Sequence, residues 1–319
     1  MKAVELQAFG QPLVVVDRPA PTIGDGEHLV DVTACGVCHS DLHVVDGQWN
    51  SPLPLVLGHE VTGDHAELGP VMVYAPWGCR ACWTCETGHE MVCPDAVEAG
   101  VISDGGYAEQ MRVPHREYLQ PLGDLDPVRA APLACAGLTA FRATRQTLEA
   151  LRRRGPVARA LVIGAGGLGQ FGIQFLKLLT DAEVTVADLS VDKRTRAIEL
   201  GADQAVTPDE LDCHFDAIVD FVGAQPTLET AVQHVNRRGM VVAVGLFGGR
   251  VPFGIGAVPH EAQFMSSVWG TVAELGELIG FAHDHPLDFT VETAPLEEAE
   301  AAHQRLRSGE ASGRMVLTT

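Results

Sequence analysis

The segment Ala160-Leu-Val-Ile-Gly164-Ala-Gly166-Gly-Leu-Gly169 carries a short apolar run into a turn with three spaced glycines. A buried strand, a glycine-rich turn and then a helix is the order typical of the first strand and helix of a dinucleotide-binding fold. Gly164 permits the tight turn, Gly166 lets the backbone approach a pyrophosphate at the helix amino terminus, and Gly169 allows the helix to pack closely on the strand. A tight turn that binds no ligand is the alternative interpretation.

An acidic residue, Asp188, closes the next predicted strand, 19 residues after Gly169. A carboxylate at this position accepts hydrogen bonds from the adenosine ribose and repels a 2′-phosphate, so we expect NAD to be favoured over NADP. The bases Lys193 and Arg194 are close in sequence and can soften that preference. The expected nucleotide-binding residues of this region are Gly164, Gly166, Gly167, Leu168, Gly169, Asp188, Lys193, Val222 and Val244.

Strands and helices alternate around the glycine motif. We expect strands at 157–163, 184–187, 217–222 and 240–244, and helices at 168–179, 192–200 and 226–235. Such alternation predicts a parallel sheet covered by helices on both faces.

The chain before the motif has a different pattern of predicted secondary structure. Short β-runs interrupted by glycine and proline are expected at 1–6, 13–16, 28–34, 71–74 and 105–113. This pattern is typical of irregular, mostly-β structure. The tail adds predicted helices at 272–282 and 296–307 and a strand at 315–318. The predicted fold class is therefore α/β, with a mostly-β domain joined to a doubly wound parallel sheet.

Length and charge limit the possible functions. At roughly 150 residues per domain, 319 residues suggest two domains. With 42 acidic and 22 basic residues the net charge is −20, which argues against nucleic acids and anionic membranes as partners. No run of about 18 apolar residues occurs, and the first residues lack the apolar stretch of a signal peptide. We expect a cytoplasmic protein without a signal peptide or a membrane span.

Four of the eight cysteines crowd into one short stretch, at Cys79, Cys82, Cys85 and Cys93. Cysteines separated by two residues can turn their thiolates towards one ion, which is the geometry of a closed tetrahedral zinc site. A closed site has no open position, so it stabilises a loop and takes no part in the chemistry. A disulfide cluster in a secreted protein and an iron–sulfur site are the alternatives, and Pro94 after Cys93 suits the latter.

A sparser set of ligand-type residues lies upstream, in Cys38-His-Ser-Asp-Leu-His43 and in Gly58-His59-Glu60. A cysteine and a histidine far apart in sequence, each with a carboxylate nearby, are what an open zinc site with oriented ligands requires. These two stretches therefore predict a second metal site, of the catalytic type.

The two upstream stretches, the four-cysteine cluster and the glycine motif, in that order, resemble the zinc-dependent medium-chain alcohol dehydrogenases. The resemblance extends over essentially the whole chain. It implies a GroES-like catalytic domain made of residues 1–137 and 268–319, with a Rossmann dinucleotide-binding domain of residues 138–267 between them. It further implies two zinc ions per chain, NAD as cofactor, and a homodimer or homotetramer.

The resemblance also supplies a third ligand for the catalytic zinc. Cys135 falls where the family places that ligand, whereas the residues alone do not distinguish it from Cys35 or Cys213. Those two are expected to be small buried hydrophobic residues. The implied ligands of the catalytic zinc are Cys38, His59 and Cys135.

Further roles are implied by position in the family. Asp41 is expected to fix the tautomer of His59, and Glu60 to lie close behind the metal. Ser40 is expected to take the proton of the alcohol and His43 to pass it towards solvent, with a role as simple loop caps as the alternative for both. The residues expected to touch the pyrophosphate and the nicotinamide of the cofactor are His39 and Thr139.

These residues predict reversible transfer of a hydride between a small alcohol and NAD, with an aldehyde or ketone as the oxidised partner. Trp49, Phe247 and Trp269 are expected to line the substrate pocket and to favour a hydrophobic alcohol. One alternative is a dehydrogenase of the same architecture for a polyol, an amino alcohol or a hydroxymethyl adduct. The other is a non-catalytic protein that binds zinc and nucleotide.

Three segments depart from the family pattern. The stretch 60–73 is too short for the usual extra β-turns. The stretch 206–215 leaves about eight residues to join two parallel strands, which is too few for a crossover helix. We therefore expect one part of the parallel sheet to be trimmed, or covered by another subunit. The third departure is Gly270-Thr271-Val272, which lacks an arginine that relatives often place near the cofactor phosphates.

Overall fold

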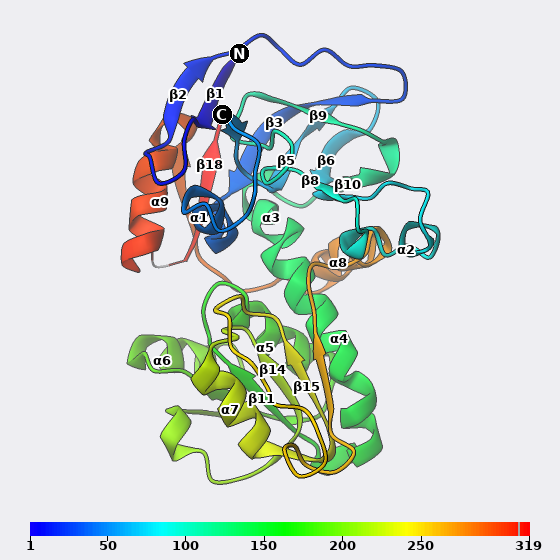
Figure 1. The fold of residues 1–319 in the computed structure, drawn as a ribbon, viewed down its shortest axis with the longest axis vertical. Helices are drawn as coiled ribbons and strands as arrows, with labels where there is room; N and C mark the ends of the chain where they lie inside the picture. The colour runs from blue at the N-terminus through cyan, green and yellow to red at the C-terminus, as the bar shows by residue number, and fades with distance from the viewer. Residues whose placement is uncertain (312) are drawn as a thin grey trace. The chain divides into compact units, whose positions relative to one another are not determined.

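The computed structural model describes residues 1–311 and 313–319. They form two compact units, one made of Met1–Leu138 with Trp269–Thr319 and the other of Thr139–Val268. Figure 1 traces the chain through the elements of both units. The expected domain boundaries, at 137/138 and 267/268, differ from these unit boundaries by one residue.

The Thr139–Val268 unit contains a six-stranded parallel sheet with the strand order β13-β12-β11-β14-β15-β16. The chain builds this sheet outward from β11 in one direction and then from β14 in the other, which is the doubly wound order of dinucleotide-binding folds. The predicted α/β fold class is therefore confirmed, and β16 is an addition to the predicted strands. The strands are β11 (Arg159–Ile163), β12 (Glu183–Ala187), β13 (Gln204–Val206), β14 (Phe215–Asp220), β15 (Val235–Ala243) and β16 (Gln263–Ser266).

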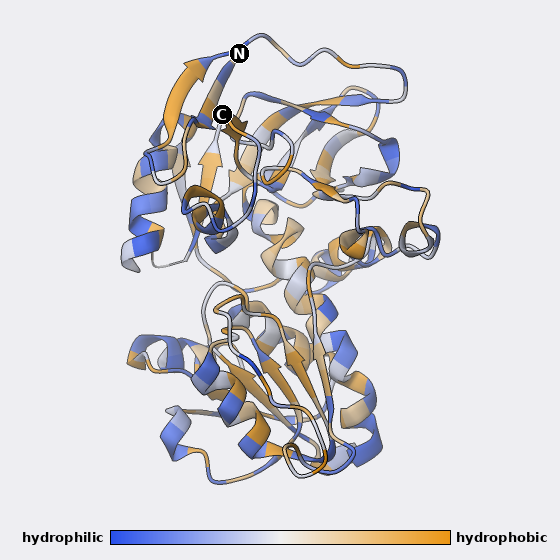
Figure 2. Ribbon diagram, viewed as in Figure 1, coloured by the Kyte–Doolittle hydropathy of each residue, from blue (hydrophilic) through white to orange (hydrophobic). Residues whose placement is uncertain are grey.

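Side chains of β11 point alternately to the two faces of this sheet, as the two-residue period of a strand requires. Ala160 and Val162 lie in a buried cluster with residues of helices α5 and α6. Leu161 and Ile163 lie in another cluster with Ala231 of α7, so α7 covers the opposite face. The strands are accordingly hydrophobic along their lengths (Figure 2). The helices are α5 (Gly169–Leu179), α6 (Val191–Glu199) and α7 (Gln225–His234).

The connection from β13 to β14 is short, as the sequence predicts. Residues 207–214, all of which the structure describes, contain one 3-10 turn, Pro208–Glu210, and no α-helix. Leu211 and Cys213 from this connection pack against the buried cluster on the α7 face. The loop therefore covers part of the area that a crossover helix would cover. Cys213 is only partly buried, which corrects the expectation of a buried residue, whereas Cys35 is buried as expected.

One long element has no counterpart in the sequence prediction. Helix α4 (Ala136–Arg154) begins in the first unit and continues into the second. Within the second unit, its Ala143 packs in a buried cluster with Val219 and Val242. The last turn of α4 consists of arginines, which complement the negative carboxyl-terminal end of the helix dipole.

The other unit is mostly β, as predicted. Its largest sheet has seven strands, and β18 from the tail pairs antiparallel with β3, placing Val316 opposite Gly36. The tail therefore completes a sheet that the first hundred residues begin. The seven strands are β3 (His28–Gly36), β5 (Glu60–His65), β6 (Gly69–Val73), β9 (Gln110–Val113), β10 (Leu119–Pro121), β17 (Val291–Pro295) and β18 (Arg314–Thr318).

Smaller elements complete this unit. A three-stranded sheet combines β1 (Lys2–Leu6), β2 (Val14–Asp17) and β4 (Leu55–Val56), and β7 (Pro76–Trp77) pairs with β8 (Val97–Glu98). The helices are α1 (His39–Val45), α2 (Trp83–Glu86), α3 (Pro127–Ala130), α8 (Val272–Asp284) and α9 (Ala299–Ser308). Across the described part of the chain, no helix combines the length and the apolar character needed to cross a bilayer.

The two remaining departures from the family pattern have local explanations. The short stretch 60–73 forms a tight antiparallel hairpin of β5 and β6, with Thr62 opposite Met72. Thr271, in the segment that lacks the arginine, caps α8, where its hydroxyl accepts a hydrogen bond from the Glu274 amide at 3.0 Å.

Candidate active site

Four donor groups from three separate segments meet in the first unit. One ligand atom each from Cys38, His59, Glu60 and Cys135 lies within 4.8 Å of the others, and all four residues are buried. Cys38 directly precedes α1, and Cys135 directly precedes α4. His59 directly precedes β5, of which Glu60 is the first residue. The Nε2 atom of His59 has no hydrogen-bond partner in the protein although it is buried. Two thiolates and an imidazole are a donor set suited to zinc, so these residues fit the metal.

The other nitrogen of the His59 ring, Nδ1, lies beside a carboxylate. Asp41 Oδ1 lies 3.3 Å from His59 Nδ1, and Asp41 Oδ2 accepts a hydrogen bond from the Cys38 backbone amide at 2.8 Å. An ionised carboxylate can only accept, so this contact favours the tautomer with the proton on Nδ1, which leaves Nε2 to a metal. The same Asp41 side chain completes the amino-terminal cap of α1, which is the local reason for its position.

The proximity of the two cysteine thiols shifts their pKa values in opposite directions. It lowers the pKa of Cys38 well below its ordinary value and raises the pKa of Cys135 well above its own, so Cys135 is the thiol that keeps its proton longer. A zinc ion is coordinated by thiolates, so its binding releases the remaining proton.

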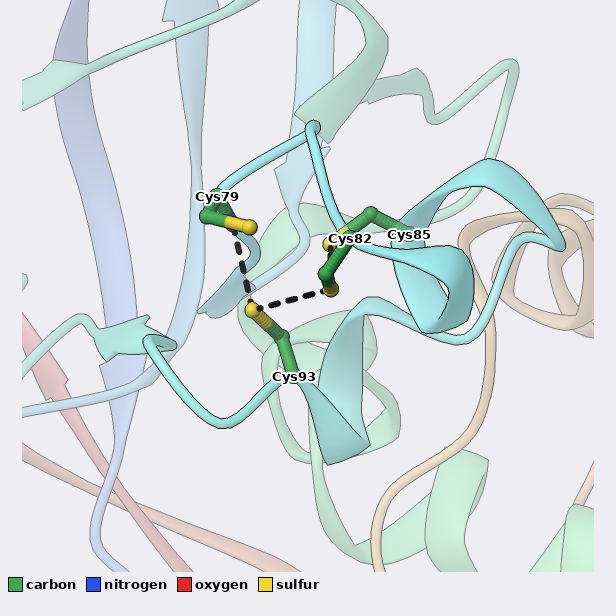
Figure 3. A group of neighbouring side chains, drawn as sticks. All are labelled: Cys79, Cys82, Cys85 and Cys93. Atoms are coloured by element: carbon green, nitrogen blue, oxygen red, sulfur yellow. Dashed lines mark hydrogen bonds between the residues drawn. The ribbon is translucent and has the colours of Figure 1, made fainter.

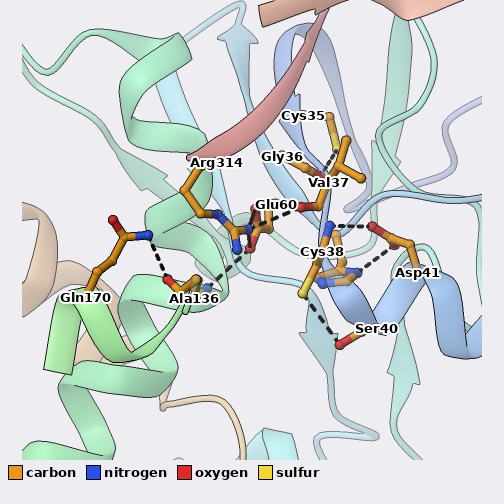
Figure 4. Close-up of polar contacts among 12 residues, drawn as sticks. Cys35, Gly36, Val37, Cys38, Ser40, Asp41, Glu60, Ala136, Gln170 and Arg314 are labelled. Atoms are coloured by element: carbon orange, nitrogen blue, oxygen red, sulfur yellow. Dashed lines mark hydrogen bonds and ion pairs between the residues drawn. The ribbon is translucent and has the colours of Figure 1, made fainter. Parts of the chain in front are cut away.

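An arginine that the sequence analysis did not single out lies behind the metal-ligand group (Figure 4). Arg314 Nη2, from the first residue of β18, lies 2.6 Å from each carboxylate oxygen of Glu60, and both side chains are buried. Burial raises the pKa of Glu60 to about 7, although Arg314 acts in the opposite direction. A Cβ atom on Gly36 would lie 1.9 Å from Glu60 Oε2, so only glycine leaves room for this carboxylate. A charged residue at the start of the apolar run Arg314-Met-Val-Leu317 is the one sequence signal of this ion pair.

Helix α1 carries the residues expected to move a proton. Ser40 Oγ lies 3.6 Å from Cys38 Sγ, next to the metal-ligand group. His43 Nδ1 lies 2.7 Å from Gln48 Oε1, and its ring centroid is 5.7 Å from that of Trp49. His39, the first residue of the helix, is exposed.

The aromatic residues expected in the substrate pocket are found in different places. Trp269 is buried, with its ring edge-on to the His59 ring at a centroid distance of 5.3 Å. Trp49 lies beside His43. Phe247 belongs to the other unit, where its side chain is 63% exposed.

An acidic side chain that the sequence analysis missed accompanies Trp269. Glu98, at the end of β8, lies close to the Trp269 side chain and is close enough to His59 to interact with it electrostatically. Burial raises the pKa of the Glu98 carboxyl. The surroundings of Trp269 are therefore less apolar than the sequence predicts.

The four-cysteine cluster is assembled as its spacing predicts (Figure 3). The sulfur atoms of Cys79, Cys82, Cys85 and Cys93 all lie within 4.8 Å of one another. Cys82 Sγ is 3.5 Å from Cys85 Sγ and 3.7 Å from Cys93 Sγ. A disulfide needs about 2.05 Å, whereas tetrahedral zinc with bonds of about 2.3 Å separates its sulfurs by about 3.8 Å. The observed spacing fits zinc and excludes disulfides within this cluster.

The Thr139–Val268 unit carries the glycine motif at the turn from β11 to α5. Gly164 has φ +86°, and a Cβ atom on Gly169 would lie 1.9 Å from the Gly164 carbonyl oxygen, so both positions require glycine. A Cβ atom on Gly166 would have no neighbour within 4 Å. Helix α5 starts without a side-chain cap at Leu168, which leaves its first backbone N–H groups available to an anion. The turn therefore fits a pyrophosphate.

The remaining nucleotide residues surround this turn. The carboxylate of Asp188 accepts hydrogen bonds from the amides of Ala165 and Ser190, both at 2.8 Å, which holds it beside the glycine turn. Arg194 donates to the backbone carbonyls of Asp188 and Leu189, whereas Lys193 is exposed. Val222 follows β14 and lies against the glycine turn, because a Cβ atom on Gly164 would approach Val222 Cγ2 to 2.6 Å. Val244 follows β15, and Thr139 is buried in α4.

Comparison with known proteins identifies the family. The chain matches the alcohol dehydrogenase GroES-like domain over residues 24–124 and the zinc-binding dehydrogenase domain over residues 167–284. An NAD-dependent alcohol dehydrogenase of Sulfolobus acidocaldarius is 34% identical over 346 residues, covering 99% of each chain. The chain belongs to the zinc-dependent medium-chain alcohol dehydrogenases. It is an enzyme that transfers a hydride between an alcohol and NAD, with zinc as its metal, which confirms the predicted activity and cofactors.

Solved structures of alcohol dehydrogenases and a related sugar dehydrogenase share the complete fold. The crystal structure of the alcohol dehydrogenase from Aeropyrum pernix matches with a TM-score of 0.89 and 32% identity, covering 100% of both chains. The D-arabinose dehydrogenase from Sulfolobus solfataricus matches with a TM-score of 0.85 and 27% identity, covering 100% of this chain and 99% of that one.

Proposed function

We propose that this alcohol dehydrogenase holds its catalytic zinc with Cys38, His59 and Cys135. The observation that carries the proposal is the buried meeting of these donors, with His59 Nε2 left without a protein partner. Glu60 is engaged by Arg314, which leaves the fourth position of a tetrahedral site for an alcohol or a water. A structural zinc is assigned to the four-cysteine cluster.

The chemistry divides between the zinc and the side chains. Zinc, when bound, acts as a Lewis acid that makes the alcohol hydroxyl more acidic. Ser40 accepts the hydroxyl proton and His43 passes it towards solvent. Asp41 keeps the proton of His59 on Nδ1, so the imidazole presents its lone pair to the metal.

For the nucleotide, we propose that the glycine turn and the amino terminus of α5 bind the pyrophosphate and that Asp188 binds the adenosine ribose. Val222 and Val244 follow the carboxyl ends of β14 and β15, the edge of the sheet at which such folds bind nucleotides. His39 and Thr139 are proposed as further contacts of NAD. The two compact units are proposed to be the nucleotide-binding and catalytic domains.

The variant His59→Ala tests the catalytic site. We expect turnover of alcohols with NAD to fall at least about 1,000-fold, because about 4 kcal/mol of Lewis-acid stabilisation is lost. Zinc content is expected to fall from two ions to one per chain. The control is His283→Ala, at an exposed position of α8. A His59→Ala enzyme with full activity or two tightly bound zinc ions contradicts the assignment.

A second candidate substrate class is favoured by Glu98. A partly buried carboxylate is costly unless a polar or cationic group meets it, and the neutral Trp269 side chain meets that need only in part. We propose that Glu98 receives a second hydroxyl or an amine of the substrate, as in a polyol or an amino alcohol. A sugar dehydrogenase among the structural neighbours is consistent with this class.

Replacement of Glu98 separates the two substrate classes. In Glu98→Leu, kcat/KM for ethanolamine is expected to fall about 10- to 100-fold relative to 1-propanol, because one hydrogen bond to a charged group is lost. The matched variant Glu98→Gln keeps a hydrogen-bonding group, so it is expected to retain diols better than amines. Equal changes for ethanolamine and 1-propanol would exclude the polar class.

We propose a homodimer or homotetramer built on the edge of the parallel sheet. Strand β16 is the last strand at that edge, and the preceding loop exposes 79% of Phe253 and all of Ile255. An exposed edge strand beside apolar side chains is a surface that a second copy of the chain can cover. A cytoplasmic location is proposed because none of the eight cysteines forms a disulfide.

A further inference from the structure

A buried row of polar side chains continues beyond Asp41, away from the metal-ligand group. The Tyr107 hydroxyl lies 3.0 Å from Asp41 Oδ2, and His303 Nε2 lies 3.1 Å from the same hydroxyl. The three side chains come from distant segments: α1, the loop before β9, and α9. Asp41 and Tyr107 are fully buried and His303 is 4% exposed. Of the three residues in this row, only Asp41 is among the predicted site residues.

Only one assignment of donors and acceptors is consistent along this row of hydrogen bonds. Asp41 is an acceptor as a carboxylate, so the Tyr107 hydroxyl must donate to it. The hydroxyl can then accept, and His303 must donate to it from Nε2. His303 is therefore the neutral Nε2–H tautomer, in agreement with a pKa that burial lowers. Every proton of the row points towards Asp41, as does that of the Cys38 amide, and His59 Nδ1 lies 3.3 Å from Asp41 Oδ1.

Packing fixes the ring of Tyr107 in place. A Cβ atom on Gly58 would lie 2.4 Å from Tyr107 Cδ1, so the ring rests directly on the backbone of the residue before His59. Gly58 has φ +93°, a conformation that few other residues adopt. The Tyr107 and His303 rings meet edge-on with centroids 5.7 Å apart. The row is therefore anchored independently of Asp41.

We propose that Tyr107 and His303 are positioning residues for the catalytic zinc, because they hold the Asp41 carboxylate in the orientation that aims His59 Nε2 at the metal. The proposal rests on the proposed role of His59 as a ligand. Tyr107 acts on Asp41 directly, and His303 acts only through the Tyr107 hydroxyl. Partners of this kind typically change metal affinity or activity 10- to 100-fold when they are removed.

The test measures zinc release from the folded enzyme into a colorimetric chelator, with the four-cysteine zinc as an internal reference. Tyr107→Phe removes only the hydroxyl and keeps the packed ring. We expect it to speed the release of the catalytic zinc about 10-fold and to change the ligand-field spectrum of the cobalt-substituted enzyme. The matched control is Tyr74→Phe, which removes a buried hydroxyl hydrogen-bonded to the Gly270 carbonyl at 2.7 Å.

The order of action is tested with His303. His303→Leu is expected to speed zinc release. His303→Gln, whose amide can still donate a hydrogen bond, is expected to release zinc at a rate closer to that of the wild type. The double variant Tyr107→Phe/His303→Leu is expected to release zinc no faster than Tyr107→Phe, because His303 acts through the missing hydroxyl.

Either of two results would overturn the inference. One is a Tyr107→Phe enzyme whose catalytic zinc is released at the wild-type rate. The other is a double variant whose effect is the product of the two single effects. A wild-type chain that holds only the four-cysteine zinc would refute the catalytic site itself, which distinguishes failure of the proposed function from failure of this inference.

Discussion

Replacement of Arg314 by methionine removes the cation from a buried ion pair. Arg314 is 4% exposed and Glu60 is fully buried, with the guanidinium 2.6 Å from both carboxylate oxygens. Methionine fills much of the same volume, so the variant Arg314→Met isolates the loss of charge from the loss of packing. The Glu60 carboxylate then keeps the Ala136 amide, at 3.3 Å, as its remaining donor.

The expected loss of stability follows from leaving the buried Glu60 carboxylate without its cation. Breaking a buried ion pair from one side costs about 3–5 kcal/mol, because a charge is left without compensation. Glu60 can limit the cost by taking up a proton, since burial already raises its pKa to about 7 beside Arg314. Without Arg314 that pKa rises further. At pH 7 we therefore expect a loss near the lower end, about 3 kcal/mol.

The pH dependence has a definite sign. The folded variant binds a proton at Glu60 that the unfolded chain, with an ordinary glutamate pKa, does not bind. Unfolding then releases this proton, so stability falls as pH rises, by about 1.4 kcal/mol per unit. In the wild-type enzyme this slope ends near pH 7, where Glu60 ionises. The difference between the two enzymes is therefore expected to grow between pH 7 and pH 9.

Urea unfolding followed by tryptophan fluorescence is a suitable assay. All four tryptophans, at positions 49, 77, 83 and 269, lie in the unit that contains Arg314, so their signal reports on that unit. Lys2→Met is the control, since it breaks an exposed ion pair with Glu297 in the same unit and is expected to cost less than about 1 kcal/mol. An Arg314→Met enzyme within about 1 kcal/mol of wild type, with no pH trend, would refute the reasoning.

Two further predictions concern the other sites. Cys82→Ser is expected to remove one zinc per chain and to destabilise the first unit by several kcal/mol. The control Cys213→Ser, at a partly buried cysteine outside both metal groups, is expected to leave zinc content and melting temperature unchanged. An unaltered melting temperature of Cys82→Ser counts against a structural site. Asp188→Asn keeps the size of the side chain but removes the charge that repels a 2′-phosphate, so the ratio of kcat/KM for NAD to that for NADP is expected to fall about 10-fold or more. An unchanged ratio would show that Asp188 does not face the ribose.

The sequence was most informative where the chemistry lies within one short segment. The four cysteines and the glycine turn are each confined to a few residues, so local backbone geometry sets the distances between their atoms. The alternation of β11, α5 and β12 was predictable for the same reason, because the hydrophobic period is a local property. Helix α4 was missed, and its buried face became evident only from what it packs against.

The catalytic group was predictable only in part. Cys38 and His59 have the residue types of a zinc site, but the choice of Cys135 among the remaining cysteines came from family resemblance and not from spacing. Glu98 gave no signal at all, because a single glutamate is ordinary in sequence. Its position beside Trp269 results from chain segments that are far apart in sequence.

By itself, therefore, the amino-acid sequence determined the α/β class, the nucleotide turn, the four-cysteine cluster and the family. Only the tertiary structure decided which charges are buried together, as for Arg314 with Glu60, and which side chains hold Asp41. The physical reason is that ligand spacing and hydrophobic period act over a few residues. The partners of a buried polar group are instead chosen by packing, which joins β18 to β3 and α9 to α1 across most of the length of the chain.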